Sequence, residues 1–318
     1  MDGPSTGQTM KKTLLSTAMT LCFMAAPFAP AFAADMPLKA APPVAPPVTP
    51  WWEIAYGGGI MSDYNFRGIS QSDRGVAGTV YVEGRANLSP VFQLYGGTAV
   101  TSVKLPTDPA AEVDFYGGLR ATMGPVTFDV GGIYYYYPKE EQIFLDPATG
   151  GAIRFPTGLP WTKNDTDFAE VYGKLTYTAT DWLTLSGYVY YSPDMLNTGA
   201  DGTYFGGSVK LTAPSAWFPT DWGAFISGEV DRYIIGTSDA FFGNVDFPDY
   251  TYWNVGLGIT YKIFTLDLRY HDTDLSRSDC FALTGDLHGL PGGGGTLGQS
   301  RWCGQAFIAK LTFDSTIK

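Results

Sequence analysis

From Trp51 almost to the end of the chain, apolar and polar side chains alternate with a period of two residues. In one stretch, Val80 and Val82 alternate with Tyr81 and Glu83. Successive side chains of a strand point to opposite faces, so each such stretch predicts a strand with one apolar and one polar face. About twelve segments follow this pattern, near residues 52–66, 79–88, 92–103, 113–123, 127–137, 168–179, 183–192, 202–213, 223–235, 250–263, 264–275 and 304–314.

The links between these segments alternate in length. Short links occupy residues 89–91, 124–126 and 180–182, while the longest ones are 138–167 and 276–303. Short turns at one end and long loops at the other are typical of bacterial outer-membrane barrels. The sequence therefore predicts an all-β fold, a transmembrane antiparallel up-and-down β-barrel of about 12 strands with its N-terminus in the periplasm. A soluble β-sandwich would show the same alternation, but strand length and loop asymmetry favour the barrel.

Aromatic residues support a membrane location. Tryptophans gather at the predicted periplasmic ends, whereas tyrosines such as Tyr64 and Tyr134 lie near the external ends. Aromatic rings at both interfaces form the girdles of such barrels. Aromatics make up 15% of the chain and charged residues 16%, which suits strands that face lipid on one side and water on the other. The tryptophans concerned are Trp51, Trp52, Trp182, Trp217 and Trp222.

The N-terminal region predicts export. Lys11 and Lys12 precede an apolar stretch that ends in the small-x-small pattern at 31–33. We therefore predict a cleaved signal peptide over residues 1–33, with Met10 as a second candidate initiator. A membrane anchor helix is the alternative, but prolines interrupt this short stretch. Residues 34–50 are rich in Pro and Ala and predict a periplasmic leader, which leaves residues 51–318 for the outer-membrane barrel.

Cleavage after Ala33 would leave 18 basic and 30 acidic residues, a balance that argues against nucleic acid as a partner. It would also remove Cys22 and leave Cys280 and Cys303, which are expected to pair in an exported protein. Two cysteines and two histidines at these spacings match no metal-ligand pattern, so neither a metal nor a cofactor is predicted.

Strand parity predicts which charged residues face the lumen. Charge on the lipid side costs about 2–4 kcal/mol at the membrane midplane, so these residues should face water or one another. They would either brace the barrel as a hydrated lattice of ion pairs or filter ions. The predicted pore-lining residues are Glu83, Arg85, Asp114, Arg120, Asp129, Glu170, Lys174, Lys210, Glu229, Asp231, Lys262, Asp267, Arg269 and Lys310.

Three short sequences carry a family resemblance: SDYNFRGISQSD at 62–73, YYYYP at 134–138 and HDTDLS at 271–276. Together they resemble the TorF family, whose members are catalogued as exported outer-membrane proteins of the porin kind without an established function. The resemblance implies a barrel with a pore and brings no catalytic residues. The motif residues are Ser62, Asp63, Tyr64, Phe66, Arg67, Gly68, Ser70, Gln71 and Ser72.

Within this motif, Arg67 is expected at the external mouth, paired with Asp63 or Asp73. His271 is the remaining candidate for chemistry, but its parity places it in the lumen and no hydrolase motif accompanies it. The chain is therefore predicted not to be an enzyme.

The combined prediction is a porin-like channel for passive diffusion of small hydrophilic solutes or ions. Inward tyrosines, among them Tyr81, Tyr95, Tyr116 and Tyr172, are expected to narrow its lumen. Expected partners are outer-membrane lipid, lipopolysaccharide and the barrel-assembly machinery, while the oligomeric state is left open. The alternative is a structural or surface-interaction barrel without an open pore.

Overall fold

The computed structural model describes residues 50–318. The predicted signal peptide (1–33) and all but the last residue of the predicted leader (34–50) lie outside the described residues. Among the described residues, no helix has the length and apolar character needed to cross a bilayer.

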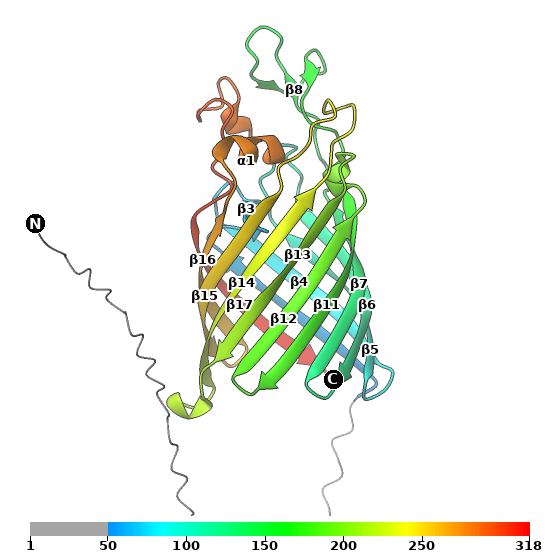
Figure 1. Ribbon diagram of the computed structural model, residues 1–318, viewed down its shortest axis with the longest axis vertical. Helices are drawn as coiled ribbons and strands as arrows, with labels where there is room; N and C mark the ends of the chain where they lie inside the picture. The colour runs from blue at the N-terminus through cyan, green and yellow to red at the C-terminus, as the bar shows by residue number, and fades with distance from the viewer. Residues whose placement is uncertain (1–49) are drawn as a thin grey trace, which may run out of the picture. The chain divides into compact units, whose positions relative to one another are not determined.

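Twelve antiparallel strands close into a barrel, as predicted (Figure 1). Each strand pairs with its neighbours in the chain, and the first strand closes the barrel by pairing with the last. The strands are β1 (Trp52–Met61), β4 (Ala77–Asn87), β5 (Phe92–Thr101), β6 (Glu112–Met123), β7 (Val126–Tyr136), β11 (Phe168–Thr180), β12 (Leu183–Ser192), β13 (Gly202–Thr212), β14 (Trp222–Ile235), β15 (Tyr250–Tyr261), β16 (Phe264–Thr273) and β17 (Ala306–Ile317).

The first and last strands differ from the prediction at their ends. The first strand was predicted to reach residue 66, but β1 ends at Met61, because the chain then turns into the barrel. The last strand continues past the predicted residue 314 to Ile317, whose Cα pairs with that of Ile54. These extra residues complete the β1–β17 seam.

The outer wall of the barrel is apolar. Every second residue of each strand points outward, and many of these valine and isoleucine side chains are more than half exposed: Val80, Val130, Val171, Ile226, Val230 and Val255. Exposed apolar side chains in such numbers belong next to lipid tails rather than water. This arrangement also rules out the soluble sandwich, in which apolar faces would pair with each other.

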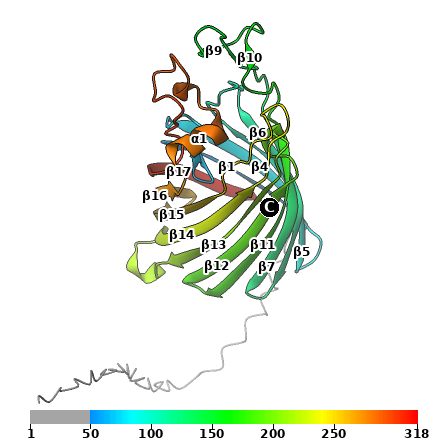
Figure 2. The ribbon, with the colours of Figure 1, turned by 45° about the horizontal axis from the view of Figure 1, so that its top comes forward.

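The two ends of the barrel differ. At one end, turns of two to four residues join most strands and a nine-residue link joins β13 to β14; Trp51, Trp182, Trp217 and Trp222 are exposed at this end. Long loops rise from the other end (Figure 2). They carry the short strands β2 (Asn65–Phe66), β3 (Ile69–Ser70), β8 (Phe144–Leu145), β9 (Ala152–Ile153) and β10 (Leu159–Pro160), and the helices η1 (Met195–Asn197), α1 (Arg277–Thr284) and η3 (Leu287–Gly289). A further turn, η2 (Ser215–Trp217), lies in the link between β13 and β14.

Candidate functional site

One side of the lumen carries a network of charged residues from β4, β6 and β7. The Arg120 guanidinium lies 3.0 Å from a carboxylate oxygen of Glu83 and 3.2 Å from one of Asp129. Glu83 also binds Arg85 at 2.6 Å. Two arginines thus share two carboxylates, so the network is neutral overall, and its arginine side chains remain partly exposed.

A second network covers the wall formed by β14, β15 and β16. Arg269 binds the Asp267 carboxylate at 2.9 Å and donates to Ser227 at 2.8 Å. Further toward the long loops, the Tyr188 hydroxyl lies 2.9 Å from the Glu229 carboxylate and 2.7 Å from that of Asp231, and its single proton can be donated to either. Carboxylates here receive hydroxyl and guanidinium donors in a wall otherwise backed by lipid, which is the arrangement that ionised groups require at this depth.

The remaining predicted lumen residues have varied surroundings. Lys174 lies over the Tyr172 ring at 4.5 Å, Lys210 lies over the Phe225 ring at 4.1 Å, and Lys310 is the register partner of Asp267. One buried carboxylate oxygen of Asp114 has no hydrogen-bond partner among residues 50–318.

Lys262 does not lie on the lumen wall as predicted. It occupies the two-residue turn between β15 and β16, is exposed, and adopts a positive φ of 53°. Its parity within the alternating run is misleading because the run continues through the turn without an interruption in the sequence.

Several inward tyrosines lie flat against the wall instead of projecting into the lumen. Tyr116 is the register partner of Gly97 on the neighbouring strand, and a Cβ placed on Gly97 would come within 2.8 Å of the tyrosine ring. The same relationship holds for Tyr81 with Gly57 and for Tyr172 with Gly131. These tyrosines therefore narrow the lumen less than their size suggests.

The link between β1 and β4 forms a hairpin, residues 62–75, that contains β2 and β3 and the family motif. Its base is held by the Asp63 carboxylate, which accepts from Ser70 at 2.6 Å, from Ser72 at 2.9 Å and from Arg74 at 3.3 Å. Tyr64 donates to Glu112 on β6. The motif serines and aspartate thus fix the shape of the hairpin.

At the hairpin tip, Arg67 binds Glu170 through two hydrogen bonds of 2.7 and 2.8 Å. Both residues are nearly removed from solvent, at 8% and 2% exposure. Arg67 pairs with neither of its expected partners, Asp63 and Asp73, because the tip of the hairpin lies far from the base of the hairpin. Four aromatic rings surround the guanidinium at 4.2–5.1 Å: Phe66, Tyr190, Tyr204 and Tyr233.

The hairpin crosses the lumen. It leaves the barrel between β1 and β4, which are neighbours, and its tip contacts residues of β11, β12, β13 and β14. The closed strand order places these four strands opposite β1 and β4. The tip carbonyl of Arg67 also accepts from the Tyr250 hydroxyl at 3.0 Å. The motif is therefore a bar across the barrel near the long-loop end.

The outer loops rest on this bar. Cys280 of α1 and Cys303 form the predicted disulfide, and the stapled segment contacts the hairpin through its backbone. Ser70 donates its N–H to the carbonyl of Trp302 at 2.9 Å, and Arg74 donates to the carbonyls of Arg301 and Cys303. The disulfide loop and the hairpin therefore form one connected cap.

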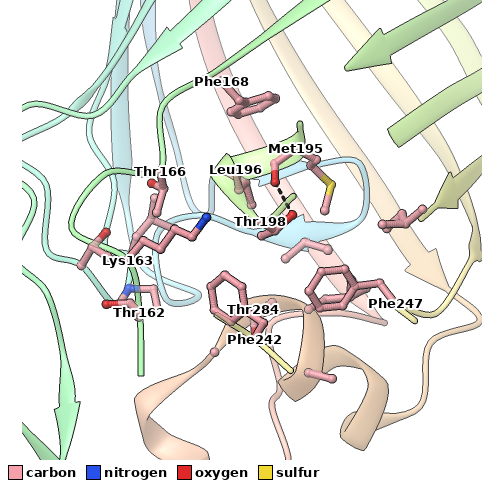
Figure 3. A pocket seen from close by; sticks show the side chains of 18 of the residues that line it. Thr162, Lys163, Thr166, Phe168, Met195, Leu196, Thr198, Phe242, Phe247 and Thr284 are labelled. Atoms are coloured by element: carbon pink, nitrogen blue, oxygen red, sulfur yellow. Dashed lines mark hydrogen bonds between the residues drawn. The ribbon is translucent and has the colours of Figure 1, made fainter. Parts of the chain in front are cut away.

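A cavity of about 350 Å³ lies between the hairpin and the outer loops. Phe66, Tyr233 and Tyr250 line it beside the hairpin, while Trp161 and Phe242 come from two outer loops. In Figure 3, Lys163, Phe242 and Phe247 extend toward the same space. These loop residues were not singled out from the sequence, since aromatic residues in loops show no periodicity.

A cluster of three carboxylates and the single residue His271 also have side chains that could carry chemistry. Glu140, Asp165 and Asp167 bring carboxylate oxygens within 4.8 Å of one another on the outer loops. Glu140 accepts from Thr166, Asp167 accepts from Tyr134 and the backbone N–H of Tyr137, and Asp165 accepts from the backbone N–H of Asp167, so hydrogen bonds account for the cluster without an ion. His271 lies on the lumen side, where its Nδ1 is 2.7 Å from the Tyr252 hydroxyl.

Comparison with known proteins gives a family match for part of the chain. Residues 45–149, which include the hairpin motif, match a family described as a bacterial protein of unknown function (Gcw_chp). This match does not confirm the TorF name suggested by the motif, which stays a prediction. No curated protein matches the chain.

Solved outer-membrane barrels are similar in fold. The COG4313 outer membrane channel from Pseudomonas putida F1 is 9% identical, with 86% of this chain and 100% of that chain covered and a TM-score of 0.44. The NanC porin is 11% identical, with 82% and 98% covered and a TM-score of 0.41. LpxR from Salmonella typhimurium is 11% identical, with 82% and 99% covered and a TM-score of 0.39.

Proposed function

We propose that this protein is a porin-like channel for passive diffusion of small hydrophilic solutes or ions across the bacterial outer membrane. The observation that carries the proposal is the pair of charged networks on the lumen wall, around Arg120 and Arg269. Ionised groups behind an apolar outer wall must face water or one another, and the paired Arg120 and Arg269 side chains are still 26% and 18% exposed on the lumen side. A hydrated path with acidic and basic groups admits small polar solutes and gives weak charge selectivity.

The proposal places the constriction at the hairpin. Solutes entering from the long-loop end would pass beside the bar formed by residues 62–75 and then meet the charged walls. The tyrosines that lie over glycines leave the deeper lumen wider than its aromatic content suggests. No catalytic role is proposed for His271, whose ring stacks on Tyr252.

The same proposal includes export and orientation. A cleaved signal peptide would deliver the chain to the barrel-assembly machinery, and the short turns would face the periplasm together with the N-terminus. The apolar outer wall would then contact outer-membrane lipid, with lipopolysaccharide around the long loops.

A second candidate function is a structural or surface-interaction barrel without an open pore. The buried Arg67–Glu170 pair favours it, since a bar fixed at both ends would block the lumen. In that case the outer loops would be the working part of the molecule.

Conductance of the refolded protein in planar lipid bilayers distinguishes the two functions. Met61 and Ala77 are register partners at the end of the β1–β4 pair, so an Asn-Gly turn can replace residues 62–76 and leave the strands paired. The control shortens the β8–β9 turn, residues 146–151, in the same way. Heat-modifiable gel mobility checks that each barrel is folded.

We expect stepwise channels from the wild type and larger steps from the hairpin replacement alone. A silent wild type with an open hairpin replacement would instead support the plugged barrel. Silence in both, with folded protein, would overturn the channel.

A further inference from the structure

We propose that the cavity above the hairpin is a binding site for a small, neutral aromatic molecule that carries one hydrogen-bond acceptor. This inference goes beyond the proposed channel and does not require an open pore. It rests on the composition of the cavity, on the position of Lys163 and on the rigidity of the segments around the cavity.

Aromatic rings line a large part of the cavity, together with aliphatic side chains such as Leu105, Met195 and Ile235. Besides Trp161 and Phe242, its lining includes Phe168, Phe247 and Trp302. Trp161 is already tilted against Phe281 of α1 at 5.7 Å between ring centroids, and Phe242 packs edge-on to Phe241 at 4.7 Å. Rings held in this way offer both faces and edges to a further ring, which favours an aromatic occupant over an aliphatic one.

Lys163 is the one charged side chain among the described residues that line the cavity. Its ammonium donates to the Asp239 carboxylate at 2.7 Å, and its side chain is only 18% exposed. The hydrogen bond from Lys163 lowers the pKa of Asp239, which also accepts from the backbone N–H of Phe241. The carboxylate therefore stays ionised and neutralises the ammonium.

An ammonium has three donors. Apart from the bond to Asp239, Lys163 makes a longer contact of 3.4 Å with Asn197, which leaves donor capacity for an occupant. Because the pair with Asp239 is neutral overall, a neutral acceptor such as a hydroxyl or carbonyl suits it better than a carboxylate. The acidic cluster of Glu140, Asp165 and Asp167 lies next to Thr166, another lining residue, and would further disfavour an anion.

The cavity is held open by rigid parts of the molecule. The hairpin beneath it is fixed by the Arg67–Glu170 pair, and the disulfide loop beside it is stapled at Cys280 and Cys303. Tyr250 in its floor is 1% exposed and bonded to the Arg67 carbonyl. A preformed apolar site binds without a large ordering cost.

Binding is tested with the folded barrel in nanodiscs of palmitoyl-oleoyl-phosphatidylcholine, because detergent would compete for an apolar cavity. The probes are benzyl alcohol, toluene, cyclohexylmethanol and benzoate, and isothermal titration calorimetry is corrected with empty nanodiscs. The variants are Phe242→Ala, Trp161→Ala and Lys163→Met. The matched control is Phe155→Ala, whose ring lies on the same outer loop as Trp161, is 72% exposed and is not part of the lining.

We expect saturable binding of benzyl alcohol by the wild type and by Phe155→Ala, and about tenfold weaker binding by Phe242→Ala and by Trp161→Ala. Lys163→Met should remove the preference for benzyl alcohol over toluene while toluene binding persists. Non-saturable uptake equal to that of empty nanodiscs would overturn the site. Tighter binding of cyclohexylmethanol or benzoate than of benzyl alcohol would overturn the assigned ligand class.

Discussion

Arg67 and Glu170, 103 residues apart in the chain, form a bidentate ion pair that joins the motif hairpin to the opposite wall of the barrel. The pair is buried and surrounded by aromatic rings, so each charge is stable in this position only because the other neutralises it. This contact makes the hairpin part of the barrel interior and not an outer loop.

Removing one partner should loosen the hairpin. Glu170→Ala leaves a buried guanidinium without its carboxylate, a change that costs about 3–5 kcal/mol. We expect faster amide hydrogen exchange in residues 62–75, with little change in the strands. Arg154→Ala, which removes exposed ion pairs on an outer loop, should cost less than about 1 kcal/mol and leave exchange in the hairpin unchanged. Equal exchange in both variants would contradict the role of the pair.

Gly68 should tolerate no side chain. Its φ is 87°, and a Cβ there would come within 2.2 Å of Thr273 and 2.8 Å of Tyr252. Gly124, in a turn, also has a positive φ but open space around it, so Gly124→Ala measures the backbone cost alone, about 1–2 kcal/mol. Urea unfolding in lipid vesicles should show a larger loss of stability for Gly68→Ala. If Gly68→Ala loses no more stability than Gly124→Ala, the hairpin can move to accommodate the added methyl group, which would contradict this prediction.

Gly97 should control the position of the Tyr116 ring. Gly97→Ala places a methyl group against that ring and against the Val82 carbonyl, so the ring must swing into the lumen and the neighbouring backbone must shift, at a cost of about 1–3 kcal/mol. We expect smaller single-channel conductance. The neighbouring Gly96 has only an ordinary contact of 3.7 Å at its Cβ position, and Gly96→Ala should leave conductance unchanged.

Removing the disulfide should affect the cap and spare the barrel. In the chain-entropy model, closing a loop of this size contributes about 3 kcal/mol. Cys280→Ser with Cys303→Ser should therefore speed proteolysis within residues 276–303, while heat-modifiable mobility is retained. Loss of the folded barrel band in this variant would show that the cap is needed for assembly.

Arg120 should set the charge balance of its wall. Arg120→Ala leaves Glu83 and Asp129 with less positive charge nearby, so cation selectivity should rise. The cation selectivity should rise by at most about fivefold. Two unit charges 4 Å apart in water interact with about 1 kcal/mol, which corresponds to that factor. Reversal potentials in a KCl gradient measure the change. Lys262→Ala, in an exposed turn, is the control and should leave the reversal potential unchanged.

The period-two pattern predicted the barrel and most of its wall because side-chain direction along a strand is a local property. Glu83 and Arg85 illustrate this, since they lie on one face and bond to each other. Lys262 was misplaced where a turn interrupts the strand without a glycine or asparagine in the sequence.

The local sequence pattern could not predict the partner of Arg67. Tyr64 and Phe66 continue the alternation of β1, so the sequence predicted that the strand continues through them. The tip of the hairpin instead contacts β11, which begins about a hundred residues later. The cavity was also not predicted, because only the conformation of the loops brings Trp161 and Phe242 into the same lining.

The closure of the hairpin onto the far wall has a consequence for the order of folding. The hairpin is encoded near the start of the described chain, but β11, β13 and β14 must be in place before its tip finds a partner. Contacts of such long sequence separation form late, because the intervening chain must first be ordered. The β1–β17 pairing that closes the barrel joins residues that lie farther apart still, so we expect the motif to dock on the open wall before the barrel closes.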